Sequence, residues 1–213
     1  MDGIGRLMES YRARMEEIGE RLSEFKGILE GSDEKVFAEL CFCICTPQSK
    51  ATACWEAISS LVENDLLFYG SEDEIRPFLG RVVFAEAKAG YIVKARRLFT
   101  RDGELRVKER MEAFNDIFKL RGWLVKNVKG IGLKEASHFL RNIGLGSNLA
   151  ILDRHIIRSL VRLGVIEENP KTLTRKAYLL IEAEMREFSR RIGISMGELD
   201  LLLWSEETGM VFK

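Results

Sequence analysis

The sequence predicts an all-α fold. Apolar residues recur at intervals of three and four along most of the chain, which is the pattern of amphipathic helices. Only three prolines are present, and few stretches alternate apolar and polar residues, so no sheet is needed. The 213 residues, 46% hydrophobic and 31% charged, are enough for one large domain or two small ones around a shared cleft.

The order of helices follows from this periodicity. The first helix ends near residues 25–27, and its apolar face consists of Leu7, Tyr11, Met15, Ile18 and Leu22. The segment SDEKVFAELCFCICT predicts a buried second helix with an imperfect cap at Ser32. Further helices are expected at residues 50–63, 72–79, 85–98, 111–119, 120–127, 134–143, 153–163, 172–192 and 195–206.

The four cysteines are expected to be core residues. They stand at positions 41, 43, 45 and 54, a spacing that fits neither a zinc ribbon nor an iron–sulfur cluster. The first three lie in an apolar run, where small apolar packing is the usual role of cysteine. We therefore expect no metal site and no disulfide.

Charge is balanced overall but uneven along the chain. The net charge is zero, whereas nucleic-acid-binding domains often have a pI above about 9. Two local stretches are basic, one with Lys88, Lys94, Arg96, Arg97 and Arg101, the other with Lys119, Arg121, Lys126, Lys129, Lys134 and Arg141. These stretches predict either a local DNA footprint or two solvated helix faces, and charge alone does not separate the alternatives.

The chain carries no recognisable targeting or membrane segment. No apolar run approaches the ~20 residues of a membrane span. The N-terminal segment is charged and heptad-like, unlike a signal or transit peptide. We expect a cytoplasmic, prokaryotic protein without a membrane partner.

One short motif indicates chemistry. Gly130-Ile131-Gly132 forms a turn whose backbone N–H groups no side chain obstructs, and a predicted helix follows. Such a turn suits a phosphate. Lys134 comes two residues later, so it is either one more phosphate contact or a reactive amine presented to a sugar. Asp153, before the helix RHIIRSLVRLG, is by itself a structural N-cap.

A resemblance makes these motifs more specific. The segments LVKNVKGIGLKEASHFLRN and AILDRH resemble the helix-hairpin-helix and Gly/Pro-Asp loop of base-excision DNA glycosylases. Asp153 follows Lys134 by 19 residues, which is the spacing of the bifunctional members. Within this group, the chain most resembles the archaeal-type 8-oxoguanine DNA glycosylase/AP lyases. This resemblance rests on the hairpin sequence, the short length, the absent C-terminal cysteine cluster and the VFK ending.

The resemblance implies an activity and its two catalytic residues. It implies excision of 8-oxoguanine in base excision repair, through a Schiff base on Lys134 and β-elimination. Asp153 would stabilise the cationic sugar, in addition to capping its helix. Two alternatives remain open: a glycosylase for another oxidised base with the same chemistry, and a non-catalytic DNA-binding hairpin.

The resemblance also implies binding residues. Gln48 would fill the gap left by the extruded base, and Lys129, Gly130, Gly132 and His155 would contact DNA. Phe84 and Trp204 would flank the purine and Lys213 would contact it, although aromatic residues are more often core and chain ends are more often frayed. His138 is expected to pack or hydrogen-bond within the hairpin.

The implied architecture has two helical subdomains beside a cleft. One is a helical barrel at residues 31–149 with the hairpin at about 120–143, and the other combines residues 1–30 and 150–213. The implied partner is damaged double-stranded DNA, bound by a monomer. No redox or metal cofactor is required, but carbonyls near Lys126, Val128 and Ile131 could hold a monovalent cation.

Overall fold

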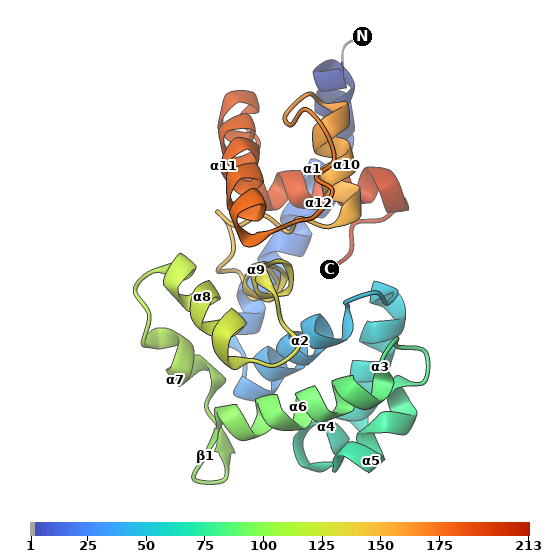
Figure 1. Ribbon diagram of the computed structural model, residues 1–213, viewed down its shortest axis with the longest axis vertical. Helices are drawn as coiled ribbons and strands as arrows, with labels where there is room; N and C mark the ends of the chain where they lie inside the picture. Colours follow the sequence, from blue (N-terminus) through green and yellow to red (C-terminus); the bar gives the residue numbers. More distant parts are fainter. Residues whose placement is uncertain (1–2) are drawn as a thin grey trace.

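The computed structural model describes residues 3–213, and helices dominate it (Figure 1). The all-α prediction is confirmed. The helices are α1 (Gly3–Glu30), α2 (Asp33–Cys45), α3 (Ala51–Glu63), α4 (Leu66–Tyr69), α5 (Glu72–Ile75), the 3₁₀ helix η1 (Arg76–Leu79), α6 (Ala85–Phe99), α7 (Val107–Glu112), α8 (Ile117–Asn127), α9 (Leu133–Asn142), α10 (Arg154–Arg162), α11 (Arg175–Ile192) and α12 (Met196–Thr208).

The structure differs from the prediction at a few elements. A short antiparallel pair, β1 (Thr100–Arg101) and β2 (Glu104–Leu105), was not expected. The helix predicted at 120–127 is present but begins earlier, at Ile117, because Asp116 accepts the amide N–H groups of Phe118 and Lys119 at 2.7 and 3.0 Å. The helix predicted at 111–119 is wrong, since α7 ends at Glu112. Met15, expected on the apolar face of the first helix, is 52% exposed.

Buried apolar side chains form two separate clusters. One lies in the lower half of Figure 1 and draws its residues from Val36 to Leu149. The other lies in the upper half, where α1 packs with α10, α11 and α12, and it continues to Val211. The subdomain boundaries stay a prediction, and residues 1 and 2 of the predicted second subdomain lie outside the described residues. No helix of residues 3–213 is both long and apolar enough to cross a membrane.

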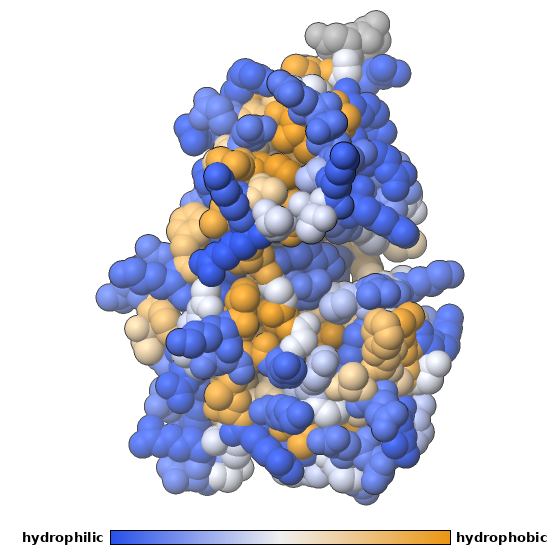
Figure 2. Space-filling view, in the orientation of Figure 1, coloured by the Kyte–Doolittle hydropathy of each residue, from blue (hydrophilic) through white to orange (hydrophobic). Residues whose placement is uncertain are grey.

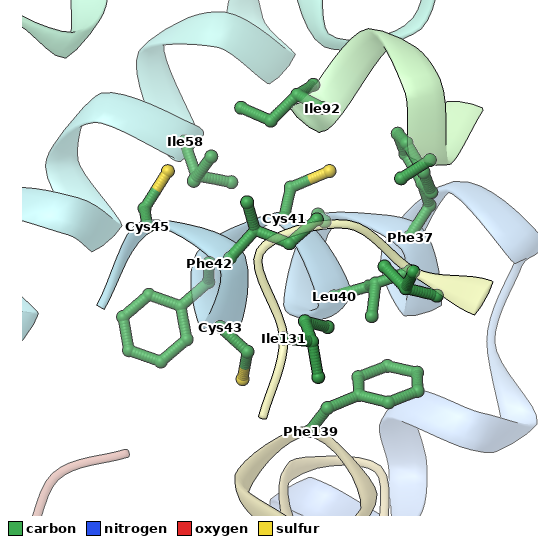
Figure 3. Close-up of a cluster of buried hydrophobic side chains, with 14 of the residues drawn as sticks. Phe37, Leu40, Cys41, Phe42, Cys43, Cys45, Ile58, Ile92, Ile131 and Phe139 are labelled. Carbon is green, nitrogen blue, oxygen red and sulfur yellow. The ribbon is translucent and has the colours of Figure 1, made fainter. Parts of the chain in front are cut away.

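The cysteines pack in the lower cluster, as the sequence predicts, and Figure 3 labels Cys41, Cys43 and Cys45 in it. All four are buried and free, and the Cys54 thiol donates a hydrogen bond to the Cys45 carbonyl at 3.2 Å. Burial raises the pKa of Cys45 to about 12, so this thiol stays protonated at neutral pH. Within the described residues, no three His, Cys, Asp or Glu side chains are grouped as a metal site would require.

A buried ion pair joins the two halves. The Arg121 guanidinium on α8 donates to both carboxylate oxygens of Glu182 on α11, at 2.5 and 2.8 Å, and both side chains are at most 3% exposed. Arg121 also donates to the Ser137 hydroxyl at 3.0 Å, and the Ala150 amide donates to Glu182 at 2.9 Å. Four segments on both sides of the junction therefore meet in one hydrogen-bonded group.

Removing one partner of this pair should destabilise the protein strongly. We expect Glu182→Ala to lower the free energy of unfolding by about 3–5 kcal/mol, because Arg121 would stay charged and buried without its carboxylate. Urea unfolding measures the change. Glu184→Ala, at an exposed position of the same helix, is the matched control and should have little effect. Equal effects of the two substitutions would contradict the bridging role of the pair.

Candidate active site

The hairpin turn positions Lys134 at the start of α9. Gly130 has a φ of +86°, which favours glycine, and a Cβ atom there would lie 2.4 Å from a ring carbon of Tyr91. The close packing of Tyr91 against this turn therefore requires a residue without a side chain. Helix α9 begins at Leu133, and the Lys134 side chain is 24% exposed. Lys134 is thus partly sheltered but accessible.

Glu135 closes the hairpin. One of its carboxylate oxygens accepts the Gly132 amide N–H at 3.1 Å, and the other lies 3.8 Å from the Lys134 ammonium. The Gly-Ile-Gly motif predicts a Gly132 amide that is open to a phosphate. In the structure Glu135 occupies that amide, so a phosphate would have to displace the carboxylate or use other groups of the turn.

Asp153 caps α10 with a single oxygen. Its Oδ1 accepts the amide N–H groups of both His155 and Ile156 at 2.8 Å, whereas Oδ2 takes part in neither bond. The N-cap prediction is therefore confirmed. The cap fixes the carboxylate in space and leaves its second oxygen available for a further role.

Lys134 and Asp153 both influence the pKa of a third residue, Asp200. Asp200 on α12 is 4% exposed, and its carboxylate lies 3.6 Å from the Arg141 guanidinium. Burial raises the pKa of Asp200 to about 6; Arg141 opposes this shift, the negative charge of Asp153 adds to it, and the positive charge of Lys134 opposes it. Lys134 of α9 and Asp153 before α10 therefore both lie within electrostatic reach of Asp200.

His138 follows Lys134 by one helical turn. It is 5% exposed and packs edge-on against Phe42, with ring centroids 5.5 Å apart. Its ring nitrogens bond to no other side chain within the described residues, but the backbone of Lys213 lies close enough to raise its pKa. Burial lowers the pKa of His138 well below its ordinary value, and the charges of Arg141 and Lys134 lower it further. This imidazole is therefore neutral at physiological pH.

The C-terminal tail docks at the junction of the two halves. Lys213 forms an ion pair with the buried Glu39 of α2, and its ammonium lies 3.4 Å from the centroid of the Trp55 ring. The Phe212 ring stacks on Trp204, with centroids 6.4 Å apart. Figure 2 shows the surface hollowed on its right side, at the level where Figure 1 places the C-terminus. The ordinary expectation of a frayed end does not hold for this tail.

The other predicted binding residues lie at separate places. Gln48 is exposed in the turn between α2 and α3, and Lys129 is exposed on the hairpin. Phe84, 60% exposed, precedes α6 and makes none of the ring contacts found in residues 3–213, so it is not brought against Trp204. His155 faces the Glu207 carboxylate at 3.7 Å. The structure tests none of their predicted roles.

Comparison with known proteins identifies the family. A family model described as 8-oxoguanine DNA glycosylase matches residues 18–194. A protein of Fusobacterium nucleatum called 8-oxoguanine DNA glycosylase/AP lyase is 48% identical, over 95% of this chain and 94% of its own length. A protein of the same name from Korarchaeum cryptofilum is 43% identical, over 100% and 98% of the two chains.

Solved structures agree with this assignment. The 8-oxoguanine glycosylase/lyase of Methanocaldococcus jannaschii, solved in complex with a 15mer DNA containing 8-oxoguanine, superposes with a TM-score of 0.88 at 37% identity, over 99% of each chain. The 8-oxoguanine DNA glycosylase of Thermotoga maritima gives 0.86 at 34% identity, over 99% of this chain and 98% of its own. This chain belongs to the 8-oxoguanine DNA glycosylase family. The resemblance inferred from its sequence is confirmed.

The basic surface of this glycosylase is smaller than the sequence suggested. Lys88, Arg121 and Arg141 are buried, and Arg96 donates to the carbonyls of Leu66, Leu67 and Gly70 at 3.4, 3.1 and 2.6 Å. Both alternatives for the basic stretches assumed exposed side chains, and both are wrong for these four residues. The exposed cations of the two stretches are Lys94, Arg97, Arg101, Lys119, Lys126 and Lys129.

Two charged residues of the site, Glu39 and Asp200, were not predicted from the sequence. Glu39 interrupts the apolar run VFAELCFCIC, and Asp200 interrupts ELDLLLW. A charge within a run that must be buried requires a partner, so this pattern could have identified both positions. The partners, Lys213 and Arg141, are distant in sequence and could not be assigned from it.

The titration of Asp200 should appear in the pH dependence of stability. Its ordinary pKa is 3.8 and its pKa in the fold is about 6, so the folded state holds the proton more tightly. The stability from this proton is full below about pH 4 and is lost as the pH rises through about 6. Between these limits the wild type should lose roughly 3 kcal/mol relative to Asp200→Asn, measured by urea unfolding across the pH range. A difference that does not vary with pH would contradict the shift.

Proposed function

We propose that this glycosylase excises 8-oxoguanine from damaged duplex DNA and then cleaves the abasic site, with Lys134 as nucleophile. The observation that carries the assignment is the placement of the two candidate groups: Lys134 is 24% exposed at the start of α9, and Asp153 caps α10 with only one of its two carboxylate oxygens. An accessible amine can form a cationic sugar intermediate, and a fixed carboxylate can stabilise it.

The first step is attack on the sugar. The unprotonated amine of Lys134 donates its lone pair to C1′, the N-glycosidic bond breaks, and its electron pair leaves with the base, which takes up a proton. Opening of the sugar ring gives an iminium between C1′ and the lysine nitrogen. Removal of a proton from C2′ then eliminates the 3′ phosphate, which is the lyase reaction.

Asp153 assists these reaction steps with Oδ2, the carboxylate oxygen that takes no part in the cap. Its Oδ1 is fixed by the amides of His155 and Ile156, so Oδ2 has a defined position. A fixed carboxylate stabilises the positive charge that develops on the deoxyribose and need not reorganise during the reaction. The structural and the catalytic roles of Asp153 are therefore compatible.

Lesion recognition is assigned to the C-terminus. The ammonium of Lys213 is held by Glu39 and Trp55, so the terminal carboxylate is the group left to meet a base. The N7–H of 8-oxoguanine is a donor that guanine lacks, and a carboxylate can accept it. Undamaged guanine would leave this acceptor unpaired, which disfavours it by ~1–3 kcal/mol. Trp204 and Phe84 would supply the aromatic faces.

The remaining assignments follow from the same reaction. Gln48 would enter the duplex in place of the base, and Lys129, Gly130, Gly132 and His155 would contact DNA. The chemistry needs only an amine and a carboxylate, so we propose no required cofactor; a monovalent cation at the hairpin carbonyls would be structural. We further propose that the protein acts as a monomer in a prokaryotic cytoplasm.

Borohydride trapping tests the nucleophile and separates the rival functions. A Schiff base on Lys134 can be reduced to a permanent crosslink, so the wild type should trap duplexes that contain 8-oxoguanine. Lys134→Gln should bind the same DNA but lose base release and crosslinking, because an amide has no basic lone pair. Lys129→Gln, on the exposed part of the hairpin, should weaken binding and still trap at saturating protein.

Trapping on different substrates distinguishes the rival functions. Trapping only on duplexes with an oxidised pyrimidine would show a different lesion choice. The absence of any adduct with the wild type would show a non-catalytic hairpin protein. An adduct that persists in Lys134→Gln would assign the nucleophile to another residue.

Deletion of Lys213 tests whether the C-terminus recognises the damaged base. Loss of the last residue displaces the terminal carboxylate, so excision of 8-oxoguanine should fall by roughly 10- to 100-fold, the factor that ~1–3 kcal/mol produces. Cleavage at a pre-formed abasic site should be largely retained, because Lys134 and Asp153 are unchanged and no base is read. The two activities are measured side by side on the shortened chain. Equal losses would mean that the tail only supports the fold, and no loss would mean that it has no role.

A further inference from the structure

Lys88 is a buried lysine that the proposed reaction does not use. It stands on α6 and is 3% exposed. Its ammonium donates to the carbonyls of Cys45 and Pro47, both at 2.7 Å, and to the Ser49 hydroxyl at 3.2 Å. All three acceptors belong to the end of α2 and the turn that follows it, so Lys88 links α6 to this turn.

The turn that Lys88 binds has a strained residue at its tip. The Ser49 amide donates to the Thr46 carbonyl at 3.0 Å, with Pro47 and Gln48 between them. Pro47 stands in the second position and Gln48 has a φ of +59°, which together define a type II turn. That position favours glycine, so an exposed glutamine there is held against its backbone preference.

The same contacts reach a second strained residue. The Val83 amide donates to the Ser49 hydroxyl at 3.0 Å, and the next residue, Phe84, has a φ of +60°. The Phe84 carbonyl accepts the backbone amide of Lys88 at 3.0 Å. Figure 2 shows apolar side chains gathered on the right edge of the lower half, over the segment before α6. Lys88 and Ser49 therefore join two exposed tips, Gln48 and Phe84.

Helix α6 also contacts the hairpin. Tyr91, one turn beyond Lys88, packs its ring against Gly130 so closely that a Cβ atom there would lie 2.4 Å from it. Lys88 and Tyr91 are three residues apart, so they lie on one side of the helix, and Phe84 directly precedes it. One face of α6 thus contacts the turn of Gln48, the residue Phe84 and the turn that precedes Lys134.

We propose that Lys88 is a positioning residue that holds the Gln48 turn and Phe84 on α6, so that both meet a DNA duplex as one rigid unit in register with the hairpin. Extruding a base from a duplex costs a few kcal/mol. A turn that is already ordered loses no further conformational freedom when it enters the gap. The inference rests on the proposed function in one respect, namely that Gln48 is the inserting residue.

Comparing a paired with an unpaired lesion tests the role of Lys88. Lys88→Met keeps the apolar stem and removes all three donors. Excision of 8-oxoguanine from a fully paired duplex should fall by about 10-fold or more, while excision of the same lesion in an unpaired bubble should change by less than about 2-fold, because an unpaired base needs little help to leave the stack. Lys176→Met, at an exposed position on α11, is the matched control and should leave the ratio of the two rates unchanged.

A milder variant keeps the test informative if Lys88→Met does not fold. Ser49→Ala removes one acceptor of Lys88 and the link to Val83, and it should lower the ratio in the same direction by a smaller factor. Fluorescence of an adenine analogue placed beside the lesion reports base extrusion directly and should fall in both variants. An unchanged ratio, or equal losses on both substrates, overturns the positioning role.

Gln48→Ala tests the underlying assignment separately. A ratio that falls in both Gln48→Ala and Lys88→Met supports the proposal. A fall in Gln48→Ala alone overturns the role of Lys88 and leaves insertion by Gln48 standing. A fall in Lys88→Met alone overturns insertion by Gln48, and with it the reason for ordering the turn. Loss of borohydride trapping on an abasic bubble in any of these variants would overturn the separation of positioning from chemistry.

Discussion

The pairing of buried charges at the junction of the two halves is the constraint on which the rest of the structure depends. Arg121 and Glu182 meet there at 2.5 and 2.8 Å with almost no exposure, the hydroxyl of Ser137 accepts a further hydrogen bond from Arg121, and the amide of Ala150 donates one to Glu182. An ion pair of this kind tolerates little displacement, because either charge without its partner would be strongly unfavourable. It fixes α8 against α11 and so fixes the two clusters relative to each other.

The same constraint explains why the site can hold a reactive lysine. Arg141 pairs with Asp200, and Lys213 pairs with Glu39, so these buried cations are neutralised by their own partners. The ion pair of Lys134 with Glu135 is long, at 3.8 Å, and the other oxygen of that carboxylate already accepts the Gly132 amide N–H. The buried cations Arg141 and Lys213 are therefore held in ion pairs, and the amine of Lys134 is left to react.

Local signals predicted what depends on neighbouring residues. The Gly-Ile-Gly turn and the Asp153 cap were both identified from a few consecutive residues, and the structure shows the turn closed against Tyr91 and the cap formed by one oxygen. Such signals also failed in one place. Two helices that meet between residues 119 and 120 were predicted, whereas the Asp116 cap begins α8 at Ile117. The basic stretches were the larger error, since charge counted along a chain does not distinguish Lys129 on the surface from Arg121 in the core.

The sequence by itself determined the all-α class, the hairpin, the cap and the family, because periodicity, glycine conformation and capping act over a few residues. Only the tertiary structure decided which distant residues meet: Asp200 beside Arg141, Glu39 under the C-terminal lysine, and Lys88 beneath the Gln48 turn. A charged residue within an apolar run indicates, from the sequence alone, that it needs a partner. Which residue satisfies it depends on the packing of whole helices, and that is settled only when the chain is folded.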